Sequence, residues 1–455
     1  MSKVLVRALA VMLPLAFVVA CSSSSDDGGG GGGGASATTS ASGDDSTATT
    51  AAPVDYEALG LWDDGPCDAS KPPLVIGLMT VFESGVLSLK DQATALEASA
   101  TAFNARGGAN GSCIQVHNCD DGGTADQALA CVREIDEAGV MATVNDQGTA
   151  GQADVSAAMQ AAGIPRVASN VVPEDASDQN AYPLDASGTG VTLLTPQALV
   201  EQDVHSIGII RVDLAAASAI SGIMGQIYDG DATFPFDGPV PAGTTDYSQF
   251  ILGAENAGAE GVTIALGENE AVQVLQAAQQ LGSSLKIGAS LGTFSQQSVA
   301  DLGDFANQVV FLWSFPPATA DVPVYEVLRA DLAASGDENL QPATLKASPM
   351  RSWIGLYALL KVLRDQQVTD FSRESISAAL QAAQDVPMLG MFGDENWTPN
   401  TNHAGFFQRG GMNHWQVWTW DPNAEANGIQ GNFVPGAEMN FDEVLCDSPL
   451  GGPCG

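Results

Sequence analysis

Short apolar runs alternate with helical stretches along this chain, and this alternation restricts the fold more than any other feature of the sequence. The runs are short and unbroken, as in strands that are buried on both faces of a parallel sheet. The first set of expected strands is 74–79, 114–117, 140–144 and 166–168, with expected helices at 87–104, 124–138 and 151–162. This order predicts a parallel sheet with helices on both faces.

The alternation starts again in the middle of the chain. Expected strands follow at 206–210, 261–266, 285–288 and 308–313, with expected helices at 215–228, 247–257 and 270–281. About 400 residues remain after the N-terminal region, which is more than one usual hydrophobic core. A second doubly wound sheet therefore fits the pattern better than an extension of the first sheet.

Three later helical stretches, 324–334, 350–367 and 372–383, have no strands between them and must pack on sheets that are already formed. Strand-like segments at 405–408 and 414–420 then complete the second sheet. If the late helices return to the first lobe, the chain crosses between the lobes three times, which creates a hinge and a cleft. The predicted fold class is α/β, with two doubly wound, Rossmann-like lobes joined by a three-crossing hinge.

The predicted domain boundaries follow from this order. We expect an N-terminal lobe over 71–188 plus 316–395 and a C-terminal lobe over 189–315 plus 396–445, followed by a tail over 446–455.

Residues 1–70 predict export and a membrane tether. A short basic start precedes an apolar stretch that is too short to span a bilayer, and Cys21 follows a small residue, so residues 1–20 have the pattern of a lipoprotein signal peptide. Cleavage before Cys21 would leave this cysteine as a lipidated N-terminus. Small and polar residues fill 22–52, and we expect a flexible linker over 21–70. An ordinary signal peptide or an uncleaved anchor helix is the alternative.

The charge balance excludes nucleic acid as a partner. The formal net charge is −38, from 54 acidic and 16 basic residues, and the basic residues form no cluster. An acidic excess of this kind is mostly a solvated surface. No second apolar segment is long enough to span a membrane, so we expect contact with the membrane through the lipid anchor only.

Six further cysteines in an exported chain predict disulfides. Their spacing matches no usual zinc ligand set, and partner histidines are missing. Locality favours Cys119 with Cys131 and Cys446 with Cys454, which leaves Cys67 with Cys113.

The sequence offers little support for catalysis. It contains no G-x-S-x-G elbow and no H-E-x-x-H motif, and neither nucleotide-binding glycine signature follows the first strand. His117 is expected to be a satisfied core or edge histidine, and Asp120 and Asp121 to cap the next helix. We therefore expect a protein that is not an enzyme and that carries no cofactor and no metal. A hydrolase on the same scaffold is an open alternative.

Binding residues are expected in the loops that follow the apolar runs, because ligands of doubly wound sheets lie outside the carboxyl ends of the strands. Thr149 and the first N–H groups of the next helix could hold a carboxylate, although Thr149 could also be a simple helix cap. Glu268 could bind an ammonium group, or it could be an exposed first-turn glutamate. The other candidates from these loops are Phe82, Glu83, Ser169, Asn170 and Asp213.

Four short motifs resemble a known family. They are Phe-Asn-Ala-Arg-Gly-Gly-Ala-Asn-Gly at 103–111, Ala-Gly-Ile-Pro at 162–165, Gly-Thr-Thr-Asp-Tyr-Ser at 243–248 and Ala-Ala-Gln-Gln-Leu-Gly at 277–282. In this order, and between about Pro73 and Trp420, the chain resembles the leucine/isoleucine/valine-binding protein family, the type I periplasmic binding fold of ABC importers.

The resemblance implies a set of ligand-binding positions. The segment after the third strand maps to Gly148, Thr149 and Ala150, which would take the ligand carboxylate, and the segment after the fourth strand maps to Ser169, Asn170 and Val171. Glu268 stands about where the family has an aromatic residue, Ser290 where it has an acidic one, and Ser88 or Leu89 where the first helix commonly has an aromatic one. These departures argue against a branched-chain amino acid as the ligand.

The expected function is that of an extracytoplasmic, lipid-anchored solute-binding protein of an ABC importer. A monomer would bind a small polar solute (an amino acid, an amide or a related carboxylate) in the cleft between the lobes and deliver it to the permease. The alternative is a ligand-sensing module that passes occupancy to a partner receptor.

Overall fold

The computed structural model describes residues 54–84, 88–148, 150–169, 178–213, 215–401, 409, 411–446, 448 and 451. Residues 55–455 form one compact unit, which contains both sheets of the protein. The predicted signal peptide, Cys21 and the predicted strand at 405–408 lie outside the described residues.

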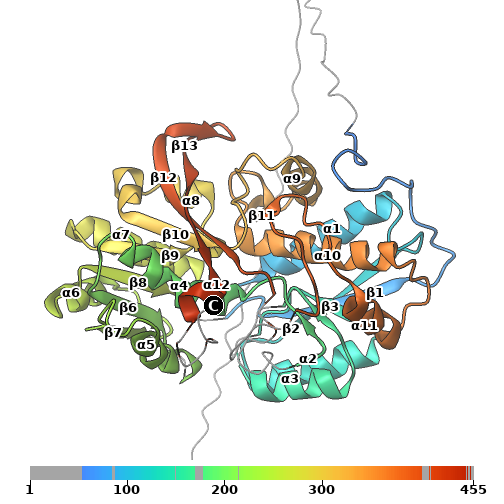
Figure 1. The fold of residues 1–455 in the computed structure, drawn as a ribbon, viewed down its shortest axis with the longest axis horizontal. Helices are drawn as coiled ribbons and strands as arrows, with labels where there is room; N and C mark the ends of the chain where they lie inside the picture. Colours follow the sequence, from blue (N-terminus) through green and yellow to red (C-terminus); the bar gives the residue numbers. More distant parts are fainter. Residues whose placement is uncertain are drawn as a thin grey trace, which may run out of the picture. The chain divides into compact units, whose positions relative to one another are not determined.

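The first sheet has five parallel strands in the order β2-β1-β3-β4-β5 (Figure 1). Leu74 pairs with Ile114 at one end of the β1–β2 ladder, and Thr80 pairs with Asp120 at the other. The elements are β1 (Leu74–Thr80), α1 (Lys90–Ala105), β2 (Ile114–Asp120), α2 (Ala125–Glu137), β3 (Ala142–Val144), α3 (Gln152–Ala161), β4 (Arg166–Val167) and β5 (Ala181–Tyr182).

The second sheet has the order β13-β12-β10-β9-β8-β6-β7. Strands β6 to β10 are parallel, whereas β12 is antiparallel to both β10 and β13. Its elements are α4 (Ser187–Val200), β6 (Ile207–Val212), α5 (Ala215–Ile227), β7 (Asp237–Val240), α6 (Ser248–Asn256), β8 (Gly261–Ala265), α7 (Glu268–Leu281), β9 (Lys286–Ser290), η2 (Leu291–Thr293), α8 (Gln296–Ala300), η3 (Gly303–Gln308), β10 (Val309–Trp313), β12 (His414–Ala426), β13 (Ile429–Asn440) and α12 (Phe441–Leu445).

The late helices return to the first sheet, as the sequence predicts. Helix α10 lies along α1 and contacts β3 and β4, and α9 also packs on α1 (Figure 1). Gly355 permits this packing, because a Cβ atom there would lie 2.6 Å from Ala168 Cβ and 3.0 Å from Val144 Cγ1. The chain therefore passes between the sheets after β5, after β10 and before β12. These elements are α9 (Tyr325–Ala333), η4 (Glu338–Leu340), α10 (Ala347–Asp365), α11 (Arg373–Ala382) and β11 (Met391–Asp394).

Helix α4 is the main element that the sequence pattern does not predict. It is apolar around most of its circumference and contains Pro196, so it shows neither a polar stripe nor an uninterrupted helical pattern. It packs on β8, β9 and β10. An apolar helix of this kind is buried by its position between other elements, which a periodicity analysis does not detect.

The predicted linker ends earlier than expected. Trp62 is only 6% exposed, and its ring stacks on Phe103 at 5.5 Å and on Tyr357 at 6.3 Å between centroids. Leu61 beside it is also buried. The prediction of a linker up to residue 70 is therefore wrong for this part, because two large apolar side chains offset the entropy of ordering the segment.

The cysteine pairing is confirmed where the structure describes it. Cys67 is bonded to Cys113, and Cys119 is bonded to Cys131. Cys446 is also disulfide-bonded. Cys454, its predicted partner, lies outside the described residues.

The motif at 103–111 has a structural role. Asn104 bonds both backbone groups of Ile114, with its Nδ2 donating to the carbonyl and its Oδ1 accepting from the amide. Arg106 forms a two-pronged ion pair with Asp331 of α9, at 2.9 and 2.6 Å. The motif thus connects the start of β2 to a helix that comes more than two hundred residues later in the sequence.

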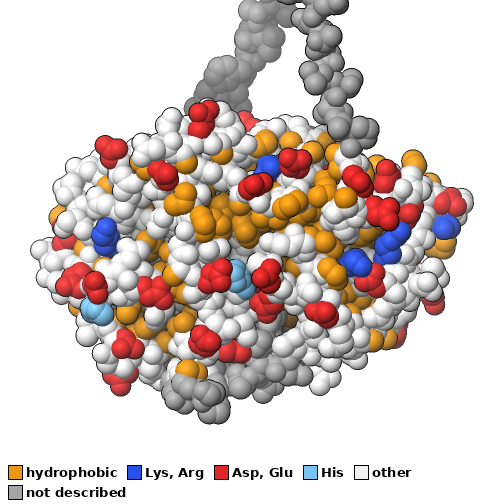
Figure 2. All heavy atoms as spheres, turned by 45° about the horizontal axis from the view of Figure 1, so that its top comes forward, with side chains coloured by type: hydrophobic (Ala, Val, Ile, Leu, Met, Phe, Trp, Pro, Cys, Tyr) orange, Lys and Arg blue, Asp and Glu red, His pale blue; other side chains and the backbone are white. Residues whose placement is uncertain are grey.

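The surface agrees with the charge balance of the sequence. Figure 2 shows acidic side chains spread over the visible face, with few basic ones among them. No described helix is long and apolar enough to cross a membrane.

Candidate functional site

A cavity of about 320 Å³ lies at the carboxyl ends of strands from both sheets. Asn145 follows β3, whereas Val212, Ser290 and Trp313 end β6, β9 and β10. In each sheet the strand order reverses next to this point, at β1–β3 and at β6–β8. The cavity therefore occupies the position at which doubly wound sheets bind ligands.

The wall on the side of the first sheet is polar, and we call it the first wall. Its residues come from the start of α1, from the loop after β3 and from the start of α10. They are Ser88, Leu89, Asp91, Gln92, Asn145, Gln147, Lys346, Ser348 and Arg351.

A buried hydrogen-bond chain holds the centre of the first wall. Asn145 has a left-handed φ of 62°, and its Nδ2 donates to Ser352 Oγ at 2.9 Å. Ser352 Oγ in turn donates to the Gln92 carbonyl, and Gln92 Nε2 donates to Gln147 Oε1 at 2.9 Å. These bonds fix the amide side chains of α1 and of the β3 loop relative to α10.

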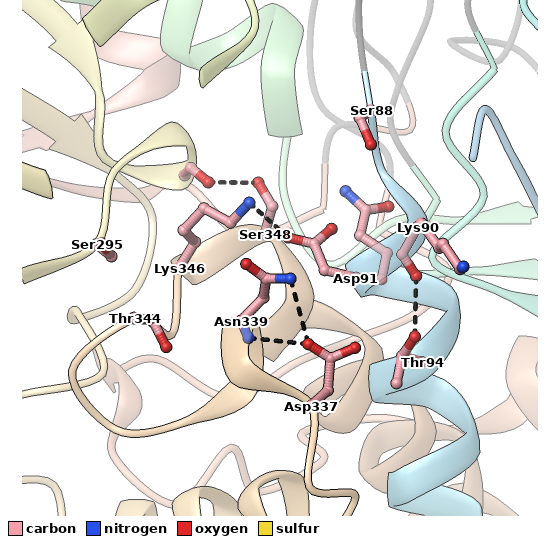
Figure 3. A network of polar contacts seen from close by, with 12 residues as sticks. Ser88, Lys90, Asp91, Thr94, Ser295, Asp337, Asn339, Thr344, Lys346 and Ser348 are labelled. Carbon is pink, nitrogen blue, oxygen red and sulfur yellow. Dashed lines mark hydrogen bonds and ion pairs between the residues drawn. The ribbon is translucent and has the colours of Figure 1, made fainter. Parts of the chain in front are cut away.

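Two ion pairs complete the first wall. Lys346 Nζ lies 2.5 Å from Asp91 Oδ2, as the dashed line in Figure 3 marks. Arg351 Nη2 donates to both oxygens of Asp185, at 2.8 and 2.9 Å, and Ser314 Oγ donates to the same carboxylate. Asp185 and Ser314 lie in two of the segments that connect the sheets, so Arg351 links the cavity to the hinge.

The opposite wall, which we call the second wall, belongs to the second sheet and has an apolar centre. Hydroxyl groups from the start of α4 and from η2 surround that centre. Its apolar residues are Val191, Val212, Ala217, Ile264, Ala265, Leu266 and Trp313. Its hydroxyl-bearing residues are Ser187, Thr189, Thr192, Thr195, Ser290 and Thr293.

The two walls meet at one direct contact. Ser348 Oγ of α10 donates to the Gly292 carbonyl at 2.8 Å (Figure 3). Gly292 has no room for a side chain, because a Cβ atom would lie 2.4 Å from Trp313 Cη2. This contact closes one side of the cavity.

One predicted ligand residue lines the cavity in the part of the chain that the structure describes. Ser290 lies on the second wall. Thr149, Asn170 and Val171 lie outside the described residues, and so does the side chain of Glu268, whose backbone begins α7 beside the cavity-lining Gly267. The remaining predicted residues are not part of the lining; they are Phe82, Glu83, Gly148, Ala150, Ser169 and Asp213.

Local hydrogen bonds explain why the β3 loop presents other residues than predicted. Asp146 turns inward, where its Oδ1 accepts from the Met79 amide at 2.8 Å and its Oδ2 accepts from Thr143. Gln147 continues beside β1 and reaches the cavity. Gly148 lies instead against Asp121 and Gln152, where a Cβ atom would lie 2.2 Å from the Gln152 amide nitrogen.

The sequence prediction missed the charged residues of the first wall. Asp91, Lys346 and Arg351 lie near the starts of α1 and α10 and not in loops after strands. A signal for Arg351 was present, because it is a charged residue in an otherwise apolar helical stretch of a chain with few basic residues. Ser88 and Leu89, where the family commonly has an aromatic residue, do line the cavity.

The titratable groups outside the cavity have structural partners. His117 Nε2 lies 3.0 Å from Glu134 Oε1 on the neighbouring helix. Asp120 Oδ1 and Asp121 Oδ1 accept from the backbone amides of Gly122 and Gly123 in the turn before α2. No group of residues that could hold a metal ion occurs among the described residues.

Comparison with known proteins decides the family. The sequence profile of a family described as periplasmic binding protein matches residues 73–409. The chain belongs to the periplasmic binding protein family. This assignment confirms the resemblance to the leucine/isoleucine/valine-binding proteins. A search of curated protein sequences finds no match.

Solved structures of periplasmic binding proteins confirm the two-lobed α/β fold. A fatty acid ABC transporter substrate-binding protein from Thermomonospora curvata has a TM-score of 0.68 at 16% identity, covering 85% of this chain and 97% of its own. An R. palustris solute-binding protein in complex with 4-hydroxybenzoate has a TM-score of 0.66 at 12% identity, covering 81% and 97%. A leucine-, isoleucine-, valine-, threonine- and alanine-binding protein from Brucella ovis has a TM-score of 0.64 at 14% identity, covering 84% and 99%.

Proposed function

We propose that this periplasmic binding protein is the extracytoplasmic, lipid-anchored receptor of an ABC importer. It binds a small polar solute, such as an amino acid, an amide or a related carboxylate, between its lobes and delivers it to the permease without chemical change. Closure of the lobes would signal occupancy to the permease.

The observation that carries this proposal is the cavity between the two sheets. Its walls come from different sheets, and they touch through Ser348 and Gly292. A solute in this cavity contacts both walls at once, so its binding favours the closed form over an open one. The volume of about 320 Å³ suits a small molecule.

The relatives support a role in solute uptake. The titles of similar structures name a fatty acid, 4-hydroxybenzoate and small amino acids as ligands of those proteins. The tether proposal rests on Cys21 and on the small, polar residues that follow it in the sequence. Such a tether would keep the binding unit close to the permease.

A thermal-shift screen tests the binding role. Residues 55–455, which form one compact unit, are heated with amino acids, amides, urea, short carboxylates and polyols. A ligand at 100 times its Kd should stabilise the folded protein by about 2.7 kcal/mol. No stabilisation by any solute would contradict the proposal, and conversion of a solute, seen by mass spectrometry, would favour an enzyme instead.

A matched pair of variants locates the binding site. Ser290→Phe places a large side chain in the cavity and should abolish the stabilisation by the ligand. Leu281→Ser changes an exposed residue at the end of α7, away from the cavity, and should leave it unchanged. An equal ligand shift in both variants would place the site elsewhere.

A further inference from the structure

Two buried nitrogen donors in the cavity wall have no hydrogen-bond acceptor. They are Arg351 Nη1 and Trp313 Nε1, in side chains whose residues are 2% and 4% exposed. A buried donor without a partner is costly and uncommon in folded proteins. Both donors belong to the cavity lining, so a bound solute with an acceptor group can satisfy them.

The guanidinium of Arg351 is held in place before any solute binds. Its Nη2 is bonded to both oxygens of Asp185, and its Cζ lies 5.4 Å from the ring centroid of Trp313 and 5.5 Å from that of Phe315. A side chain that is already fixed loses little conformational entropy on binding. Guanidinium groups also bind carboxylates more strongly than neutral acceptors.

Helix dipoles add to the positive potential of the cavity. Four helices of nine residues or more begin at its walls, and the residues at or just before their starts, Leu89, Ser187, Gly267 and Lys346, line it. The N-cap residue of each makes no side-chain capping bond, although Asp185 Oδ1 accepts from the Ser187 amide. Helix N-termini stabilise negative charge.

The carboxylate of the first wall does not oppose a bound anion, since it has its own cation. Asp91 Oδ2 lies 2.5 Å from Lys346 Nζ, and its Oδ1, which has no partner, is left to accept from a solute donor. Across the cavity, Val212, Ile264 and Ala265 present an apolar surface. The two walls together suit a molecule with an anionic end and an apolar body.

We propose that the solute is a carboxylate with an apolar body, and that Arg351 is the residue that selects it. The carboxylate accepts a hydrogen bond from Arg351 Nη1, and the apolar body packs on Val212, Ile264 and Ala265. This inference rests on the proposed solute-binding function and narrows its substrate class.

The test compares each carboxylate with its own primary amide, which has nearly the same size and shape. Three pairs are titrated against residues 55–455 by calorimetry: hexanoate and hexanamide, benzoate and benzamide, leucine and leucinamide. In at least one pair the carboxylate should bind about ten- to a hundredfold more tightly than the amide. This comparison uses the unmodified chain, so it does not depend on the folding of any variant.

Two variants of helix α10 then test the role of Arg351. Arg351→Met should reduce the preference for the carboxylate to about onefold. Lys361→Met, which removes the same charge from the exposed face of the same helix, should keep it. If Arg351→Met fails to fold, Asp185→Leu combined with Arg351→Met removes both buried charges together and serves the same comparison.

Each outcome decides the matter. A preference for the carboxylate that is lost with Arg351 and kept without Lys361 supports the inference. Equal or tighter binding of the amides, a preference that survives Arg351→Met, or binding of only uncharged solutes overturns the inference and leaves the solute-binding function intact. A failure of every solute to bind, including the wider screen, overturns both.

Discussion

The ion pair between Arg106 and Asp331 should be among the most costly in the protein to break from one side. Its atoms lie 2.9 and 2.6 Å apart, its side chains are only 6% and 10% exposed, and Trp353 Nε1 donates to the same carboxylate at 2.8 Å. Burial alone would lower the pKa of Arg106, but the hydrogen bonds and charge of Asp331 raise it overall, so the guanidinium stays charged.

The expected magnitude depends on what each substitution leaves behind. Asp331→Leu strands a buried guanidinium and the Trp353 N–H, so it should lower the free energy of unfolding by about 3–5 kcal/mol. Arg106→Met should cost about 3 kcal/mol, because Asp331 keeps one donor. The double variant removes both charges together and should cost at least about 2 kcal/mol less than the sum of the single variants.

Urea denaturation followed by tryptophan fluorescence measures these values. Lys361→Met is the control, because Lys361 forms an exposed ion pair with Asp365 at 2.5 Å, and its loss should cost at most about 0.5 kcal/mol. Additive single substitutions, or a cost of Arg106→Met no greater than that of the control, would refute the reasoning. They would also show that α9 is not fastened to the motif at 103–111.

Three further predictions concern packing, pH and the disulfides. Gly355→Ala should destabilise the protein by about 1–3 kcal/mol because its new methyl group meets a neighbouring Cβ atom at 2.6 Å, whereas Gly222→Ala, with open space around it, should stabilise it by up to about 1 kcal/mol; thermal unfolding distinguishes the two. Burial raises the pKa of the Tyr325 hydroxyl well above its usual value of 10.0, so the unfolded chain loses this proton first and stability falls as the pH rises above that value; Tyr325→Phe should reduce the fall by up to about 1.4 kcal/mol per pH unit in urea titrations. Replacing Cys67 and Cys113 by serine opens a loop with a sequence separation of 46 and should cost roughly 4 kcal/mol, seen as a lower urea midpoint; an unchanged midpoint would contradict the loop-entropy argument.

Local sequence patterns determined the fold class and most of its elements. A strand such as Leu74–Thr80 is an unbroken apolar run, and a helix such as Ala125–Glu137 carries its own cap at Thr124 and its own apolar stripe. These signals lie within a few residues of one another and need no knowledge of distant contacts. The two disulfides that the structure describes in full were predictable for a related reason, because the order of the strands limits which cysteines can meet.

Tertiary structure alone decided the composition of the binding site. Arg351 lies 166 residues from Asp185, its charged partner, and no local pattern relates the two. Whether Gln147 or Gly148 faces the cavity depends on Asp146, whose carboxylate bonds to a strand 67 residues earlier. A site built from the starts of helices and the ends of strands exists only once both sheets have formed, because each wall is completed by contacts between segments far apart in the chain.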